Sequence, residues 1–220
     1  MILDARELSA TEQDALAEIA NIGVSRAAAS LRQIVGEQVL LSVPAVKIVS
    51  RTTAAQLVDG DSASKLVAVQ QSFEGPFSGR AMLIFPQAQS LELVRSIVGE
   101  DHSLEDVIDL EQEALAETGN VILNACLATI ANLLRRTMRM SLPSVVRGDG
   151  KTLFEVQQAT AEVDLVLFLY IDFTIKNRDI RGFIALLMDL PSIIALKKIV
   201  RLHRGRRAAS TLVCQLTKPF

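Results

Sequence analysis

The chain has no tryptophan, one tyrosine and only two cysteines among its 220 residues. So few aromatic rings provide no stacking platform of the kind that sugar and base binders use. Cys126 and Cys214 lie far apart, outside any Cys-x-x-Cys or Cys/His cluster, so the pattern suggests neither a disulfide scaffold nor a zinc site. We therefore expect reduced thiols and an aliphatic core.

An excess of charge of either sign is also missing. Lys and Arg number 23 against 25 Asp and Glu, a formal net charge of −2, so there is no electrostatic footprint for nucleic acid. The N-terminus lacks a basic segment followed by an apolar one, and charges or prolines interrupt every apolar run well before ~20 residues. We expect a cytoplasmic protein with no nucleic-acid partner and no membrane insertion.

What the sequence does contain is a copy of itself. Residues 11–46 align with residues 110–145 at an offset of 99, with eleven identical pairs where composition alone predicts roughly two or three. The rest of each copy repeats more loosely. We expect two repeats, about 9–100 and 108–201, followed by a basic, solvated tail at 202–220.

Each repeat is predicted to fold as a long helix, a strand, a hairpin and a short helix. A helix and a half-sheet cannot bury their apolar faces alone, so the repeats should pack into one domain. The predicted fold class is α+β, with a pseudo-two-fold axis, two long helices on a shared, mostly antiparallel sheet, and short helices ending each half. Three segments are expected to be loops or linkers: 49–64, 100–106 and 148–160.

The first long helix has clear end signals. A capping box at Ser9 and Glu12 predicts a start near Thr11, and Gly36 predicts the end. One arc of its helical wheel is apolar and should face the core. The members of this arc are Leu16, Ala20, Gly23, Val24, Ala27, Leu31 and Ile34. The matching arc of the second helix, near 110–135, includes Cys126.

The opposite, polar arc repeats as well. A core requirement explains a repeated apolar stripe, but it does not explain a repeated exposed Glu-x-x-Asn, because Lys, Gln or Arg would serve a solvated surface equally well. The doubled motif is the main functional candidate, and the alternative is a solvated surface that matches by chance. The arc contains Asp14, Glu18 and Asn21 in the first helix and Glu113, Glu117 and Asn120 in the second.

This pattern resembles the signature of the CheC/CheX/FliY family of chemotaxis phosphatases. The matching residues are Asp14-x3-Glu18-x2-Asn21-x22-Pro44 and Glu113-x3-Glu117-x2-Asn120-x22-Pro143. The resemblance covers both halves up to about residue 200. It implies a phosphatase, a hydrolase acting on the aspartyl phosphate of a CheY-like response-regulator receiver domain in chemotaxis or related two-component signalling.

The resemblance also implies roles for the repeated Glu and Asn. Glu18 and Glu117 would anchor the phosphorylated receiver through its active-site lysine, and Asn21 and Asn120 would position the attacking water. An aspartyl phosphate is already activated and its Mg²⁺ is expected on the receiver, so the partner only has to hold a water in line. No metal site and no cofactor of this chain's own are expected.

The remaining motif positions are expected to contribute to binding. Pro44 and Pro143 would orient the segment after each helix. Asp14 fits the family pattern, whereas Glu113 does not, because the family usually has Asp or Ser at that position. The longer carboxylate predicts that the first site is the more active of the two.

Two classes of function remain open. The first is catalysis, and the second is a non-catalytic adaptor that docks a receiver or a CheD-like deamidase on the same surface. The presence of both asparagines favours catalysis, since a docking surface needs no water-positioning amide. The sequence shows no appended motor-switch module, which favours a stand-alone phosphatase over a flagellar-switch component.

Overall fold

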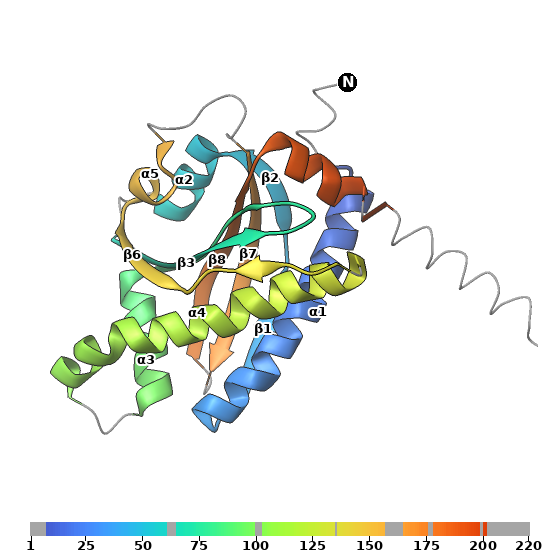
Figure 1. Ribbon diagram of the computed structural model, residues 1–220. Helices are drawn as coiled ribbons and strands as arrows, with labels where there is room; N and C mark the ends of the chain where they lie inside the picture. The colour runs from blue at the N-terminus through green and yellow to red at the C-terminus, as the bar shows by residue number, and fades with distance from the viewer. Residues whose placement is uncertain are drawn as a thin grey trace, which may run out of the picture.

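The structure, a computed structural model, describes residues 8–60, 65–99, 103–134, 136–156, 165–175, 178–198 and 200–201 (Figure 1). The first half runs α1 (Ala10–Val35), β1 (Val39–Ser42), β2 (Val46–Ser50), α2 (Arg51–Asp59), β3 (Leu66–Glu74), β4 (Gly79–Pro86) and α3 (Gln87–Val98). The second half repeats this order as α4 (Leu104–Leu134), β5 (Arg139–Met140), β6 (Ser144–Gly148), α5 (Gly150–Leu153), β7 (Leu165–Ile175), β8 (Arg178–Met188) and a last helix that includes residues 190–198.

The predicted ends of α1 are confirmed. The Ser9 side chain accepts a hydrogen bond from the Glu12 N–H while the Glu12 carboxylate accepts one from the Ser9 N–H, which completes the capping box. At the other end Gly36 adopts the left-handed conformation, with φ 73°, and its N–H bonds to the Arg32 carbonyl oxygen.

The eight strands of the described residues form one antiparallel sheet in which the two halves interleave. The order is β1-β7-β8-β4-β3-β5, with β2 also pairing β7 and β6 also pairing β3. The short strands β1 and β2 of the first half therefore pair with β7 of the second half. In the same way, β5 and β6 of the second half pair with β3 of the first. The β4–β8 pair joins the halves at the centre. The predicted fold class is confirmed.

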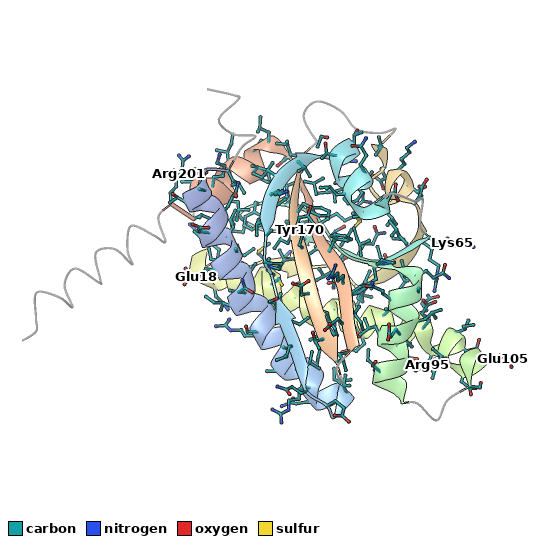
Figure 2. The ribbon with its side chains drawn as sticks, turned by 180° about the vertical axis from the view of Figure 1, so that it is seen from behind. Glu18, Lys65, Arg95, Glu105, Tyr170 and Arg201 are labelled. Carbon is teal, nitrogen blue, oxygen red and sulfur yellow. The ribbon has the colours of Figure 1, made fainter. Side chains whose placement is uncertain are left out.

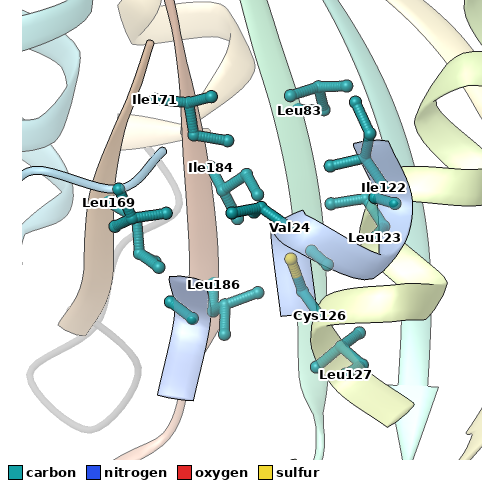
Figure 3. Packing of buried hydrophobic residues seen from close by; sticks show 14 of the residues in the cluster. Val24, Leu83, Ile122, Leu123, Cys126, Leu127, Leu169, Ile171, Ile184 and Leu186 are labelled. Atoms are coloured by element: carbon teal, nitrogen blue, oxygen red, sulfur yellow. The ribbon is translucent and has the colours of Figure 1, made fainter. Parts of the chain in front are cut away.

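The sheet lies between two layers of helices (Figure 1). The long helices α1 and α4 pack on one face together with α3 and the last helix, while α2 and α5 cover the other face with a smaller cluster. In the larger core, Val24 and Cys126 of the helices meet strand residues such as Ile184 and Leu186 (Figure 3). Both long helices thus lie on the same face, as predicted.

The two long helices approach closely at Gly23. A Cβ on Gly23 would lie 2.8 Å from the Cys126 Cα, so only glycine allows this backbone contact. Gly23 and Cys126 were both predicted to face inward, and both are buried. The predicted inward position of Ile34 is wrong, because its side chain is 48% exposed near the end of α1, beyond the sheet contact.

Two segments predicted as loops contain helices. Ser50 caps α2 by accepting from the Thr53 N–H, and Asp149 caps α5 by accepting from the Thr152 N–H. Each helix is short and packs on the second face of the sheet, so its apolar pattern was too brief to recognise. A usable signal existed, since the two capping residues are 99 positions apart.

The predicted linker at 100–106 is wrong in its second part. Helix α4 already begins at Leu104, and Ser103 accepts from the Asp106 N–H at its start. The acidic residues that suggested a linker instead occupy the first turn, where negative charge favours a helix. Residues 100–102 and the predicted tail at 202–220 lie outside the described residues.

One helix in the described part of the chain, Glu105–Asn132 within α4, is long and apolar enough to span a membrane by length and composition alone. More than half of its most apolar window is buried inside the fold. Core helices of this kind pass the same test, and this helix packs against α1, α3 and the sheet.

Candidate functional site

The polar face of α1 is turned away from the sheet. Asp14 and Glu18 are exposed, and Glu18 projects from the outer side of the helix (Figure 2). Asn21, one turn later, is half-buried. The predicted accessibility of the first Glu is confirmed, whereas the first Asn is only partly open to solvent.

The side-chain amide of Asn21 is bound to the protein's own backbone. Its Oδ1 accepts from the Val43 N–H at 2.8 Å, and its Nδ2 donates to the carbonyl oxygens of Val43 at 3.1 Å and Ala17 at 2.9 Å. The amide thus pairs with Val43 as a neighbouring strand would. Both hydrogens and one lone pair of the amide are occupied.

The two motif prolines each lie at a break between short strands. Pro44 is exposed between β1 and β2, which pair with β7, and Pro143 is half-buried between β5 and β6, which pair with β3. Proline has no N–H to give to a strand ladder, so such breaks suit it. In the first half, Asn21 binds the residue just before this proline. The repeated spacing therefore has a structural basis there.

The polar face of α4 carries the second copy of the motif. Glu113 and Glu117 are exposed and Asn120 is half-buried, as in α1. The Asn120 Oδ1 accepts from the Gln71 Nε2 at 3.1 Å and from the Asn124 Nδ2 at 2.7 Å. Its Nδ2 has no acceptor among the described residues, so the second amide keeps a donor available.

The segment before each proline differs between the halves. Val43 is 2% exposed beneath Asn21, whereas Leu142, at the matching position, is 89% exposed. In the second half the Gln71 Nε2 instead binds the Ser141 carbonyl oxygen at 3.0 Å. Sequence reasoning missed Gln71 and Asn124, because neither is repeated: the residues at the matching positions of the other half are not amides.

A groove follows α4 beyond the second site. It has a volume of about 400 Å³ and runs between the outer side of the helix and the segment that leads into β5. Its lining includes Asn124, Ala128, Asn132, Arg136 and Met138. The second site thus opens onto a hollow surface that mixes apolar and polar groups.

A third repeated pair, Glu12 and Glu111, is structural. Both side chains are buried, although Glu is rarely buried without a partner. Glu12 binds Arg201 at 2.8 Å beside Lys197, and Glu111 binds Arg147 at 2.6 Å. Burial opposes ionisation of Glu12, but the Ser9 N–H and the two cations outweigh it and hold its pKa below the usual value. Arg201, whose side chain is 63% exposed, is therefore held at the surface by this ion pair.

No cluster of three or more His, Cys, Asp or Glu side chains that could hold a metal occurs in the part of the chain that the structure describes. Burial raises the pKa of the Cys126 thiol to about 12, so this cysteine is not a nucleophile at neutral pH. The motif residues of the two helices carry carboxylates and amides, which can bind cations, donate hydrogen bonds and orient water.

Comparisons with known proteins agree with this fold and these motifs. The model of the family described as "Chemotaxis phosphatase CheX" matches residues 67–165, and that of the "CheC-like family" matches residues 12–48. These ranges contain both copies of the motif. Over these ranges the chain is similar to the CheX and CheC-like families.

Two curated relatives come from Bacillus subtilis. The chain is 27% identical to the CheY-P phosphatase CheC over 139 residues, 61% of this chain and 65% of CheC. It is 22% identical to the flagellar motor switch phosphatase FliY over 141 residues, 63% of this chain and 36% of FliY. The chain therefore spans less than two thirds of the length of these relatives.

The fold is also seen in a solved structure. Thermotoga maritima FliY superposes with a TM-score of 0.71 at 16% sequence identity, covering 89% of this chain and 98% of that one. This likeness concerns the fold, that is, the arrangement of helices and strands.

Proposed function

We propose that this protein hydrolyses the aspartyl phosphate of a CheY-like receiver domain. The observation that carries the proposal is the pair of Glu-x-x-Asn motifs on the outer faces of α1 and α4, each with an exposed Glu and a half-buried Asn. The relative named CheY-P phosphatase supports the same substrate class, and the relative named flagellar motor switch phosphatase supports a phosphatase activity. A cytoplasmic location, where receivers are phosphorylated, is part of the proposal.

In the proposed mechanism, Glu18 or Glu117 binds the active-site lysine of the receiver. Water attacks the phosphorus, the bond between phosphorus and the aspartate oxygen breaks, and free aspartate and inorganic phosphate result. The receiver supplies the Mg²⁺ that neutralises the phosphoryl charge, and this chain supplies an Asn side chain that orients the reacting groups. Such a reaction needs no nucleophile, metal or cofactor from this chain.

An adaptor role is a second candidate for the first site only. The Asn21 amide already makes three hydrogen bonds to the backbone, so it has to break at least one of them before it can orient a water. A surface that only docks a receiver through Glu18 needs no such change. A CheD-like partner stays a prediction from the family resemblance.

The test is the rate of phosphate loss from a phosphorylated CheY-like receiver, with and without this protein. We expect acceleration by the wild type and loss of acceleration in the Asn21→Ala/Asn120→Ala double variant, with receiver binding retained. Binding without acceleration by the wild type would support the adaptor role instead. Unchanged acceleration by the double variant would contradict the mechanism.

A further inference from the structure

The inner side of the second site contains a buried amide that the first site lacks. Gln71 lies in β3 and is 2% exposed. Its counterpart in the other repeat is Ile171 of β7. Val46 and Val145 are equivalent in the two repeats, and they pair with Leu169 and Val69, respectively. Two residues after each of these partners stand Ile171 and Gln71. A polar side chain therefore replaces an apolar one beneath α4.

Gln71 determines which atom of Asn120 faces outward. The Ser141 carbonyl oxygen can only accept, so the atom of Gln71 that lies 3.0 Å from it has to be the nitrogen Nε2. The same nitrogen lies 3.1 Å from Asn120, so Asn120 has to present its Oδ1 there. Asn124 donates to this oxygen as well. Both lone pairs of the oxygen are used, and Nδ2 is left as the outward group.

This arrangement has a cost for the fold. The Gln71 Oε1 and the Asn124 Oδ1 are buried and have no donor among the described residues. A buried acceptor without a partner destabilises the folded state, and an isoleucine at position 71 would remove one of the two. Buried unsatisfied amides are rare in folded proteins and call for an explanation other than stability.

We propose that Gln71 is a positioning residue that holds Asn120 with its Nδ2 outward, so that the second site meets its substrate with a hydrogen-bond donor. The inference rests on the proposed function. With its oxygen occupied, Asn120 cannot accept a hydrogen bond from the attacking water, so this role differs from the water-positioning role that the family resemblance implies. A fixed N–H donor instead suits the phosphoryl oxygens, on which negative charge lies throughout the transfer, because it needs no reorganisation during the reaction. Asn21 has no such free donor, since both its N–H groups bind backbone oxygens.

The first part of the test needs no activity. The substitution Gln71→Ile introduces the residue of the other repeat, and the ¹³Cγ chemical shift of Asn120 reports how many donors its carbonyl oxygen accepts. We expect this shift to move upfield in the variant while the melting temperature stays equal or rises. An unchanged shift would overturn the assigned orientation. If Gln71→Ile fails to fold, Gln71→Met, of similar length but without N–H groups, replaces it.

The second part measures phosphate loss from the receiver. We expect Gln71→Ile to lower the maximal rate about tenfold or more without changing the receiver Kd. The matched control is Gln70→Ile, the same substitution one residue earlier, where the side chain lies on the other face of the sheet; it should change neither. Equal losses in both variants, or none in Gln71→Ile, would overturn the proposal.

The two tests separate this inference from the proposed function. If wild-type protein fails to accelerate phosphate loss, the proposed function fails, while the ¹³Cγ shift still decides whether Gln71 orients Asn120. If the wild type is active and the shift moves but the rate does not, the orientation is correct and its catalytic role is refuted.

Discussion

The two Glu-x-x-Asn motifs have the same spacing but different surroundings. The Asn21 amide hydrogen-bonds to the backbone of Val43. The Asn120 Oδ1 instead accepts from the Gln71 Nε2 on the inner side, which leaves the Asn120 Nδ2 on the outer side. The first amide is bound to the backbone on both its oxygen and its nitrogen, whereas the second has no acceptor for its nitrogen among the described residues. The sequence argument based on Glu113 ranked the first site higher, and the geometry around the two amides favours the second.

The largest expected difference between the sites is in the effect of removing each amide. Asn120→Ala should slow receiver dephosphorylation by about 100-fold, the usual scale for losing one preorganised donor. Asn21→Ala should change the rate less than threefold but destabilise the protein by about 1–3 kcal/mol, because the Val43 N–H and C=O lose their partners. Phosphate release and urea denaturation of both variants measure this. Equal slowing by both variants would show that the two sites are equivalent.

Next in size is the contribution of the two glutamates to binding. Glu117→Ala and Glu18→Ala should each weaken receiver binding at their own site by about tenfold, or 1.4 kcal/mol, with little change in the rate at saturation, because the carboxylate contact already exists in the bound ground state. Titration calorimetry with a stably phosphorylated receiver mimic measures the Kd. Glu→Gln at the same positions removes the charge but keeps the size of the side chain, so the Kd of these variants shows how much of the effect is due to charge. A fall in saturated rate with unchanged Kd would reverse the assignment.

A smaller effect should come from the glycine that precedes Asn120. A Cβ on Gly119 would clash with the Val69 side chain, so Gly119→Ala should push α4 from β3 and cost about 1–3 kcal/mol. It should also separate Asn120 from Gln71 and slow the second site several-fold. The matched control is Ala20→Gly at the equivalent position of α1, which should only lower helix stability, by about 1 kcal/mol. A normal rate in Gly119→Ala would show that this close packing does not control the site.

The smallest effect concerns pH and the anchor of α1. The pKa of Glu12 in the folded protein lies below its ordinary value of 4.5, so the ionised form stabilises the fold above that pH. This contribution is lost as the pH falls through the lowered value. Glu12→Gln should therefore flatten the acid side of the stability curve, measured by melting temperature between pH 3 and 7. Arg201→Gln should also weaken the dependence of the melting temperature on acidic pH. If neither variant changes that dependence, ionisation of Glu12 does not contribute to stability.

The sequence predicted the repeat, both long helices, the shared sheet and the outward direction of both glutamates, because helical periodicity and capping are local signals. It could not predict what lies beneath each asparagine. Val43 and Gln71 reach the helices through long-range strand pairing, and the residue that distinguishes the sites, Gln71, stands where the other repeat has an isoleucine. An internal repeat indicates what is shared and conceals such single differences.

The interleaved sheet also governs how the chain can be made. Strands β1 and β2 pair with β7, on the order of 100 positions further along the chain, so these pairings close slowly compared with local contacts. While the chain emerges from the ribosome, the first repeat has to wait with its short strands unpaired until β7 has been synthesised. The second site likewise needs both repeats, since Gln71 comes from the first and Asn120 from the second. A chain cut between the repeats would lose strand pairing in both fragments and would have to reassociate as a two-chain complex to rebuild this site.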